Sequence, residues 1–272
     1  MKGHDTALVD VSDEVLAKSK LAITKSLGRI QEKFSQDPKY GYLEGAEVFM
    51  SSALKRLTLT TDMKAFVESA DIVIESIVEN IDAKKKLFAE VDKVAAPKCI
   101  FASNTSSLPI AEIASATNRK DRFGGLHFFN PVPVMRLLEV IKTDDTTEGT
   151  FNALMKFGTN LGKHCVTCKD TPGFIVNRLL VPYLGEAVHM AERGDATIAD
   201  IDMAMKHGAA YPMGPFELAD FVGLDVVKFI LDGWNEKFPD VELFRTSPLL
   251  DRLVSEGKLG RKTGEGFYKY DK

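Results

Sequence analysis

The stretch Gly124–Ile141 constrains the fold of this chain more than any other part of the sequence. It holds two apolar runs separated by Pro131 and Pro133, with His127 in the first run and Glu139 in the second. Proline fixes its own φ angle and pushes the residue before it into an extended conformation. The sequence therefore predicts two strands joined by a short, stiff connector, which would bring His127 and Glu139 together.

A histidine beside a carboxylate is well suited to act as a general base. The carboxylate fixes the tautomer of the imidazole and stabilises the imidazolium that forms when the ring takes a proton. The alternative is a structural histidine in the core whose ring nitrogen is hydrogen-bonded to an acid. The pair alone does not decide between the catalytic and the structural role. Asn130 is expected on the connector between them.

Composition excludes several classes of protein. The 272 residues are 44% hydrophobic and 27% charged, which is typical of a globular protein large enough for two domains. A net charge of −4 gives no reason to expect nucleic acid or an anionic membrane as a partner. No apolar run approaches the roughly 20 residues that cross a bilayer, and the first residues resemble neither a secretory signal nor a transit peptide.

The three cysteines, Cys99, Cys165 and Cys168, favour a reducing compartment without structural disulfides. Cys165 and Cys168 have the spacing of a redox pair or of half a zinc site. No second Cys/His pair accompanies them, and the alternating run around them predicts a strand. We therefore predict no metal site.

Strands alternate with helices through the first half of the chain. Apolar runs predict strands at Thr6–Asp10, Leu57–Thr61, Asp71–Ile77 and Cys99–Ser103, with helices at Ser12–Ile30, Met63–Ser69, Ile81–Val94 and from about Pro109, and a loop at Gln36–Gly45. This rhythm predicts an α/β fold with a doubly wound, Rossmann-like sheet. The near-continuous apolar run at 71–77 predicts a parallel strand covered on both faces.

Polar residues gather where these strands end. In doubly wound sheets ligands bind beyond the carboxyl ends of the strands. Asp10 ends the first strand. An acid at this position of a dinucleotide-binding domain binds a hydroxyl of the adenosine ribose. Glu79 with Asn80, the segment Ser103–Ser107, and His127 are expected at the same edge.

The character of the sequence changes after the segment with Glu139. A helix at Glu148–Leu161 and a strand at His164–Lys169 complete the first domain, and nearly everything beyond Thr171 predicts helix. We therefore predict a domain of residues 1–170 followed by an all-α domain of residues 171–272. The long apolar segment Phe174–Arg193 is either a central core helix or a subunit-interface helix.

With these features the sequence resembles the L-3-hydroxyacyl-CoA dehydrogenases of fatty-acid β-oxidation, of the animal mitochondrial short-chain type. The resemblance runs from about Gly3 to Tyr270. It is carried by the motifs FASNTSSLPI (101–110), GLHFFNPVPVMRLLEV (125–140), KDTPGFIVNRLLVPYL (169–184), AAYPMGPFELADFVGLD (209–225) and GRKTGEGFYKY (260–270).

The resemblance implies roles for individual residues. His127 would take the hydroxyl proton of the substrate, oriented by Glu139. Ser106 and Asn177 would hold the substrate oxygen in line for hydride transfer. The residues that match cofactor contacts are Asp10, Glu79, Lys84, Ser106, Asn130 and Lys262.

The resemblance also implies an activity and a setting. The family oxidises (S)-3-hydroxyacyl-CoA to 3-oxoacyl-CoA with NAD as the hydride acceptor. Membership would make the chain an oxidoreductase of the mitochondrial matrix with an acyl-CoA substrate, forming a homodimer through its helical domain.

One departure from the family pattern concerns the N-terminus. The family begins with a strand, a Gly-x-Gly-x-x-Gly turn and a helix, whereas Gly3 here matches the end of that helix, and no such glycine motif occurs near the N-terminus. The turn is where backbone N–H groups receive the pyrophosphate. We therefore expect a sheet lacking its first strand, with two unpaired strand edges, and weak NAD binding by this chain alone.

Two alternatives to a catalytic dehydrogenase stay open. The chain could be a non-catalytic short form that binds acyl-CoA or dimerises with a complete subunit. A weaker alternative is a related dehydrogenase of a sugar acid or small hydroxy acid. The close match of the stretches at 128–135 and 169–184 to the hydroxyacyl-CoA dehydrogenase motifs argues against it.

Overall fold

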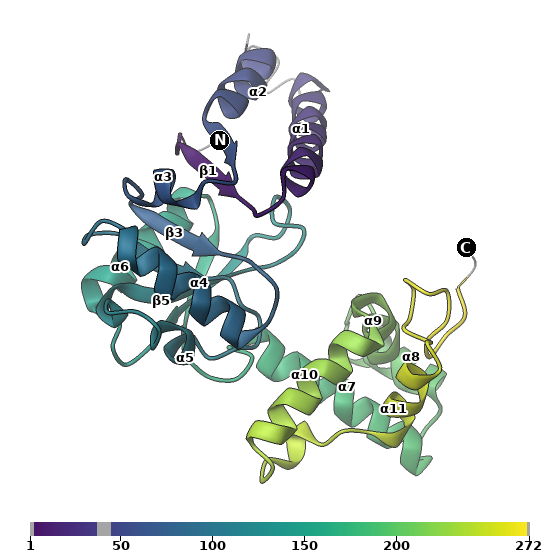
Figure 1. The fold of residues 1–272 in the computed structure, drawn as a ribbon. Coiled ribbons are helices and arrows are strands. Elements are labelled where there is room, and N and C mark those ends of the chain that lie inside the picture. The colour runs from purple at the N-terminus through teal and green to yellow at the C-terminus, as the bar shows by residue number, and fades with distance from the viewer. Residues whose placement is uncertain (1–2, 37–44, 271–272) are drawn as a thin grey trace. The chain divides into compact units, whose positions relative to one another are not determined.

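The computed structural model describes residues 3–36 and 45–270, without side chains at 33–36 and 45–49. The chain divides into two compact units (Figure 1). The first comprises Met1–Thr105 and Ile110–Asp170, and the second comprises Ser106–Pro109 and Thr171–Lys272. Residues 37–44 of the predicted loop at Gln36–Gly45 lie outside the described residues.

The first unit alternates strands and helices as the sequence predicts. Its elements are β1 (Thr6–Val9), α1 (Asp13–Gln36), α2 (Gly45–Lys55), β2 (Leu57–Thr60), α3 (Met63–Val67), β3 (Ile72–Glu75), α4 (Ile81–Val94), β4 (Ile100–Ser103), α5 (Ile110–Ala114), η1 (Lys120–Arg122), β5 (Phe123–Phe128), β6 (Leu137–Lys142), α6 (Glu148–Asn160) and β7 (His164–Lys169). Five strands form one sheet in the order β3-β4-β5-β6-β7, and only the β5–β6 pair is antiparallel.

Helices cover both faces of the five-stranded sheet. On one face Phe101 of β4 packs against Phe88 of α4, with ring centroids 5.5 Å apart. On the other face the next residue, Ala102, belongs to a buried cluster that includes Leu154 of α6. Successive strand residues point to opposite faces, so this alternation buries both. The predicted doubly wound α/β fold is confirmed.

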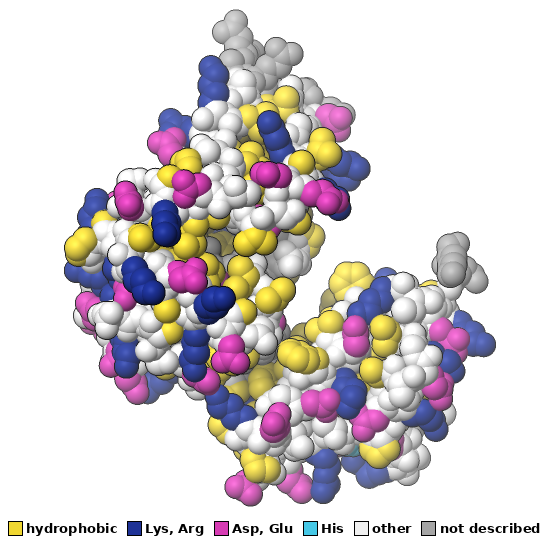
Figure 2. All heavy atoms as spheres, viewed as in Figure 1, with side chains coloured by type: hydrophobic (Ala, Val, Ile, Leu, Met, Phe, Trp, Pro, Cys, Tyr) yellow, Lys and Arg dark blue, Asp and Glu magenta, His cyan; other side chains and the backbone are white. Residues whose placement is uncertain are grey.

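The remaining two strands form a separate sheet. β1 pairs in parallel with β2 alone, and β3 pairs with β4 alone, so one edge of β1 and one edge of β3 have no strand partner among the described residues. The sequence predicted these unpaired edges. The prediction that β3 is buried on both faces was wrong, because Ile74 is 37% exposed in this edge strand. Hydrophobic side chains show on the surface around these strands (Figure 2).

The second unit is helical. Its elements are α7 (Val176–Arg193), α8 (Ile198–Gly208), α9 (Pro215–Val222), α10 (Leu224–Lys237), η2 (Glu242–Phe244) and α11 (Pro248–Ser255). Val181 and Leu184 of α7 are buried against Leu231 and Trp234 of α10 in its main core. Of the two readings of the segment 174–193, a core helix is therefore the one observed within this unit.

Two buried carboxylates organise the second unit. Asp202 accepts the backbone N–H groups of Phe216 and Glu217 at the start of α9, at 2.8 and 3.1 Å. Asp220 accepts the backbone N–H of Phe267 and the hydroxyl of Tyr270, both at 2.9 Å. Burial, followed by the hydrogen bond to Asp220, raises the pKa of Tyr270 to about 12. These contacts fix the segment after α11 onto the helices.

Within the described part of the chain, none of the helices has the length and apolar character needed to span a membrane.

Candidate active site

His127 and Glu139 meet across the β5–β6 pair. The two residues are direct register partners, and Nδ1 of His127 lies 2.7 Å from Oε2 of Glu139. The histidine is 4% exposed and the carboxylate is fully buried. The predicted approach of these two side chains is confirmed. A carboxylate on Nδ1 fixes the ring orientation and leaves proton transfer to Nε2.

The connector between β5 and β6 is held by a residue from elsewhere in the chain. The ammonium of Lys163, just before β7, donates to the carbonyl oxygens of Val132 and Met135. Desolvation lowers the pKa of Lys163. Asn130 is exposed at the start of this connector. Lys163 therefore positions the segment that carries Asn130, a role that no motif in the sequence announced.

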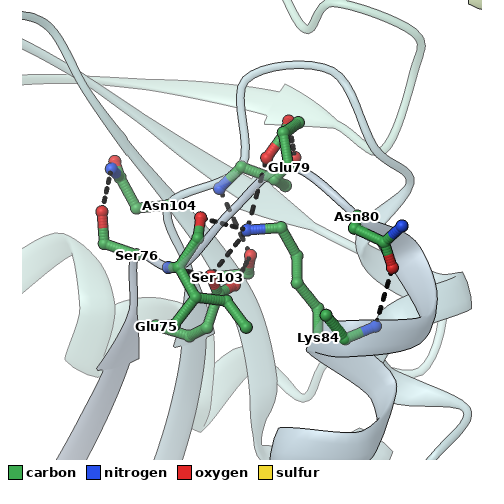
Figure 3. Close-up of polar contacts among 10 residues, drawn as sticks. Glu75, Ser76, Glu79, Asn80, Lys84, Ser103 and Asn104 are labelled. Carbon is green, nitrogen blue, oxygen red and sulfur yellow. Dashed lines mark hydrogen bonds and ion pairs between the residues drawn. The ribbon is translucent and has the colours of Figure 1, made fainter. Parts of the chain in front are cut away.

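A buried polar network lies at the carboxyl ends of β3 and β4 (Figure 3). The ammonium of Lys84 lies 2.6 Å from Oε1 of Glu75 and 3.3 Å from Oε2 of Glu79. The hydroxyl of Thr105 donates to Oε1 of Glu79 at 2.5 Å. Asn80 caps α4 by accepting the N–H of Ala83 at 2.9 Å. Glu79 lies at this edge as predicted, and Lys84, which the sequence placed only on the following helix, lies beside it.

The asparagine that follows β4 connects this edge to the histidine strand. Oδ1 of Asn104 accepts the backbone N–H of Phe128 at 2.8 Å, and its amide donates to the hydroxyl of Ser76 at 3.1 Å. Phe128 directly follows His127. The ends of β3, β4 and β5 are therefore joined by hydrogen bonds into one polar edge.

Asp10 fits a ribose hydroxyl at the end of β1. Its Oδ1 accepts the N–H of Ser12 at 3.0 Å, and no hydrogen bond or ion pair among the described residues involves Oδ2. A carboxylate oxygen at the end of a parallel strand is the acceptor that the adenosine ribose of NAD needs. Asp10 thus offers an acceptor that fits the adenosine side of the cofactor.

The predicted residues of the second unit also have defined partners. The side-chain amide of Asn177, at the start of α7, donates to the backbone carbonyl of Ser106 at 3.2 Å. The ammonium of Lys262 lies 2.5 Å from Oδ1 of Asp225, with the lysine side chain 44% exposed. Ser106 and Asn177 are therefore neighbours, and Lys262 is paired with an acid of α10. Their contacts with substrate and cofactor stay predictions.

Glu75 is a buried residue of this edge that was not predicted from the sequence. It ends the apolar strand β3, where an acid would usually be exposed, yet its side chain is entirely buried. The available signal was a lysine nine residues later, on the first turns of α4. A buried acid needs a partner of opposite charge, and the helix after the strand is the nearest element that can supply one.

The fold and this edge define a class of protein. A doubly wound fold with a carboxylate after one parallel strand and a histidine–carboxylate pair near the end of another is the arrangement of a dinucleotide-dependent dehydrogenase. Family models agree: "3-hydroxyacyl-CoA dehydrogenase, NAD binding domain" matches residues 1–171, and "3-hydroxyacyl-CoA dehydrogenase, C-terminal domain" matches residues 173–270.

Individual relatives are similar over nearly the whole chain. "Hydroxyacyl-coenzyme A dehydrogenase, mitochondrial" is 58% identical in Rattus norvegicus and 56% identical in Homo sapiens, each covering 98% of this chain and 84% of the relative. The crystal structure of (S)-3-hydroxybutyryl-CoA dehydrogenase PaaH1 from Ralstonia eutropha is 38% identical with a TM-score of 0.91, covering 100% of this chain and 92% of that one. The chain belongs to the 3-hydroxyacyl-CoA dehydrogenase family, and its first domain is the NAD-binding domain of that family.

Proposed function

We propose that the chain oxidises the hydroxyl of an (S)-3-hydroxyacyl-CoA to the 3-oxo group, with NAD as the oxidant. The observation that carries this proposal is the His127–Glu139 pair, 2.7 Å apart at the carboxyl edge of the sheet. Family membership supports the substrate class. NAD, when bound, accepts the hydride that leaves carbon 3 of the substrate.

The side chains of the chain move one proton and hold the reacting oxygen. Nε2 of His127 takes the hydroxyl proton as the carbon–oxygen bond gains double-bond character, and Glu139 stabilises the imidazolium that results. Ser106 and Asn177 position the same oxygen. Asp10 binds the adenosine ribose, while Glu79, Lys84, Asn130 and Lys262 are assigned to other parts of the cofactor.

These roles divide between the two domains. We assign residues 1–170 to the cofactor and to the histidine base, and residues 171–272 to the substrate and to dimerisation. The mitochondrial names of the rat and human relatives support the mitochondrial matrix as the compartment.

The test is the reverse reaction, followed by the loss of nicotinamide absorbance when the chain is mixed with NADH and acetoacetyl-CoA. We expect NADH to be consumed only when acetoacetyl-CoA is present. His127→Gln should lower the rate by at least about 100-fold, since a positioned base contributes that much or more. The control is His207→Gln, which changes a histidine of α8 that is exposed and far along the chain from the pair.

One observation favours the second candidate, a non-catalytic form that binds acyl-CoA or a complete subunit. β1 and β3 each keep one edge without a strand partner among the described residues. A sheet divided in this way would hold the two ends of a dinucleotide less rigidly. Binding of acetoacetyl-CoA without any consumption of NADH would favour this candidate over the dehydrogenase.

A homodimer is the proposed assembly. Val226 and Phe229 are 40% and 57% exposed and lie three residues apart on α10, so they share one face of the helix. An exposed apolar face on the helical domain supports a second copy as its partner.

A further inference from the structure

The ring of Phe129 lies against the imidazole of His127. The two ring centroids are 4.5 Å apart, and the ring planes are inclined by 53°. Residues two apart in an extended segment point to the same side, which brings the side chain of residue 129 beside that of residue 127 at the end of β5. The proposed function by itself gives Phe129 no role, so the contact needs an explanation of its own.

A hydrogen bond at one ring atom fixes an imidazole only in part. Nδ1 of His127 lies 2.7 Å from Oε2 of Glu139. This contact fixes the place of Nδ1, but by itself it lets the ring tilt about the line that joins the two atoms. Such a tilt moves Nε2, the atom that takes the substrate proton in the proposed function. A contact on the ring itself, such as that of Phe129, restricts the tilt.

The backbone on either side of Phe129 is held by side chains from other parts of the first unit. Before it, the N–H of Phe128 donates to Oδ1 of Asn104 at 2.8 Å. After it, the ammonium of Lys163 donates to two carbonyl oxygens of the connector, at 2.5 and 2.7 Å. Phe129 therefore lies between two fixed points of the chain, and its half-buried ring can support the imidazole.

We propose that Phe129 is a positioning residue that holds the imidazole of His127 in the orientation needed for proton transfer. This inference rests on the histidine base of the proposed function. An aromatic pair at this separation favours the paired arrangement about two- to twelvefold, beyond the effect of the area that the rings bury. Because the rate of a reaction depends steeply on the orientation of the reacting groups, loss of the ring contact should lower the turnover number by a factor of similar size.

The experiment measures two quantities in the wild-type chain and in variants of it. The first is the turnover number with NADH and acetoacetyl-CoA, together with the KM of each. The second is the order parameter of the Cε1–H bond of His127, which NMR relaxation reports on the picosecond-to-nanosecond timescale. The chain has five histidines, and the signal of His127 is the one that is missing in His127→Gln.

Phe129→Leu removes the ring and keeps an apolar side chain. We expect the turnover number to fall at least about threefold and the order parameter of His127 to fall with it. The KM of each substrate should stay within about twofold of the wild-type value, since the tilt of the base affects the chemical step and not binding. Phe129→Tyr restores a ring at the same place, so it should show the wild-type order parameter and at least about half of the wild-type turnover number.

The matched control is Phe151→Leu, which makes the same replacement in a half-buried phenylalanine of α6. Phe151 packs against the cluster that contains Leu126 and Leu138. His127 directly follows Leu126 in β5 and therefore points to the other face of the sheet. This variant should leave the turnover number and the order parameter of His127 at their wild-type values.

The two quantities must change together. A lower turnover number with an unchanged order parameter in Phe129→Leu would overturn the proposal, and so would a lower order parameter with unchanged turnover. Losses in Phe129→Tyr as large as those in Phe129→Leu would also overturn it, because the ring contact would then not be the cause.

Two further outcomes keep the test decisive. If Phe129→Leu does not fold, as judged by circular dichroism, the same comparison in Phe129→Met decides. If the wild-type chain consumes no NADH with acetoacetyl-CoA, the proposed function fails, and this inference fails with it. Wild-type activity with both quantities unchanged in Phe129→Leu overturns this inference alone.

Discussion

At the scale of single residues, buried acids set the chemistry of this chain. Glu139 contacts His127, Glu75 contacts Lys84, and Asp202 and Asp220 accept backbone N–H groups in the second unit. Burying a carboxylate is costly unless charged or hydrogen-bonding partners surround it. Each of these acids therefore fixes the position of the groups that donate to it, and His127, the proposed base, is one of these groups.

Replacing Glu139 by glutamine tests the orienting role of the carboxylate. An amide cannot stabilise the imidazolium of His127 by charge, so we expect the turnover number to fall about 100-fold or more. The KM for NADH should stay within about threefold of the wild-type value, and steady-state kinetics measure both. Glu148→Gln is the control, because this acid is exposed on α6. Wild-type turnover in the Glu139 variant would contradict the assignment.

The acid Glu217 gives a pH-dependent prediction for the second unit. The hydrogen bond from Lys206, at 2.6 Å, holds the pKa of Glu217 below its ordinary value of 4.5. A carboxyl whose pKa is lowered by folding stabilises the fold above the ordinary pKa, and this stabilisation is lost as the pH falls through the lowered value. Glu217 also accepts the N–H of Gly214 at the start of α9.

We therefore expect Glu217→Gln to lower the free energy of unfolding by about 1 kcal/mol at pH 7. The difference from the wild type should shrink as the pH falls below about 4. Urea unfolding at a series of pH values measures both effects. Glu236→Gln, an exposed acid near the end of α10, should show neither. If the difference in unfolding free energy between the variant and the wild type grew as the pH falls, the proposed role of the Glu217 carboxylate would be contradicted.

At the scale of elements, the antiparallel pair β5–β6 positions the two side chains of the candidate site. Its register places His127 opposite Glu139, and a one-residue slip of β6 would turn Glu139 to the face opposite His127. The connector of the pair is fixed by Pro131 and by the Lys163 ammonium on the carbonyl oxygens of Val132 and Met135. The connector is therefore part of the site.

Replacing Lys163 by methionine should loosen this connector without changing the strands. The N–H groups of Val134 and Met135 donate to the carbonyl of Pro131, and their protection from hydrogen exchange should fall. Loss of two hydrogen bonds to carbonyl oxygens corresponds to roughly 1 to 3 kcal/mol. Hydrogen exchange followed by mass spectrometry of residues 129–136 measures the change. In Lys156→Met, on the exposed side of α6, exchange of this peptide should equal that of the wild type.

At the scale of the whole molecule, the two units have different kinds of architecture. The first is built on a mostly parallel five-stranded sheet with helices on both faces, and the second is a helical core closed by its C-terminal segment. In a doubly wound fold the carboxyl edge of the sheet is the surface on which a cofactor binds. The exposed apolar residues of α10, on which the proposed dimer depends, belong to the other unit.

Phe229→Glu should weaken the proposed dimer, because it places a charge in the middle of the apolar face of α10. We expect the dimer dissociation constant to rise at least about tenfold, since an unpaired charge buried in an interface costs several kcal/mol. Sedimentation equilibrium measures the constant. Leu243→Glu in η2 is the control, because Leu243 is 61% exposed and lies outside that face. A dimer of unchanged strength in the Phe229 variant would place the interface elsewhere.

Much of the fold could be predicted because local patterns carry it. The short apolar runs that became β1 to β4 and the segments that became α4, α6 and α7 were found within a few residues of their observed bounds. The meeting of His127 and Glu139 was predictable as well, because two prolines between two apolar runs leave few other ways to connect them.

The burial of the two faces of each strand could not be predicted from local patterns. The apolar run at 71–77 predicted a strand buried on both faces, yet β3 lies at the edge of its sheet with Ile74 partly exposed. Burial depends on which strands become neighbours, and the sequence of one strand contains no information about its neighbours.

The sequence by itself determined the class of fold, the place of the histidine–carboxylate pair and the family, because these depend on periodicity, prolines and motifs along the chain. Only the tertiary structure decided that Glu75 is buried, that Lys84 is enclosed between two acids, and that Lys163 holds the connector. A contact between side chains of distant segments, and the exclusion of water from that contact, form only when the segments pack together.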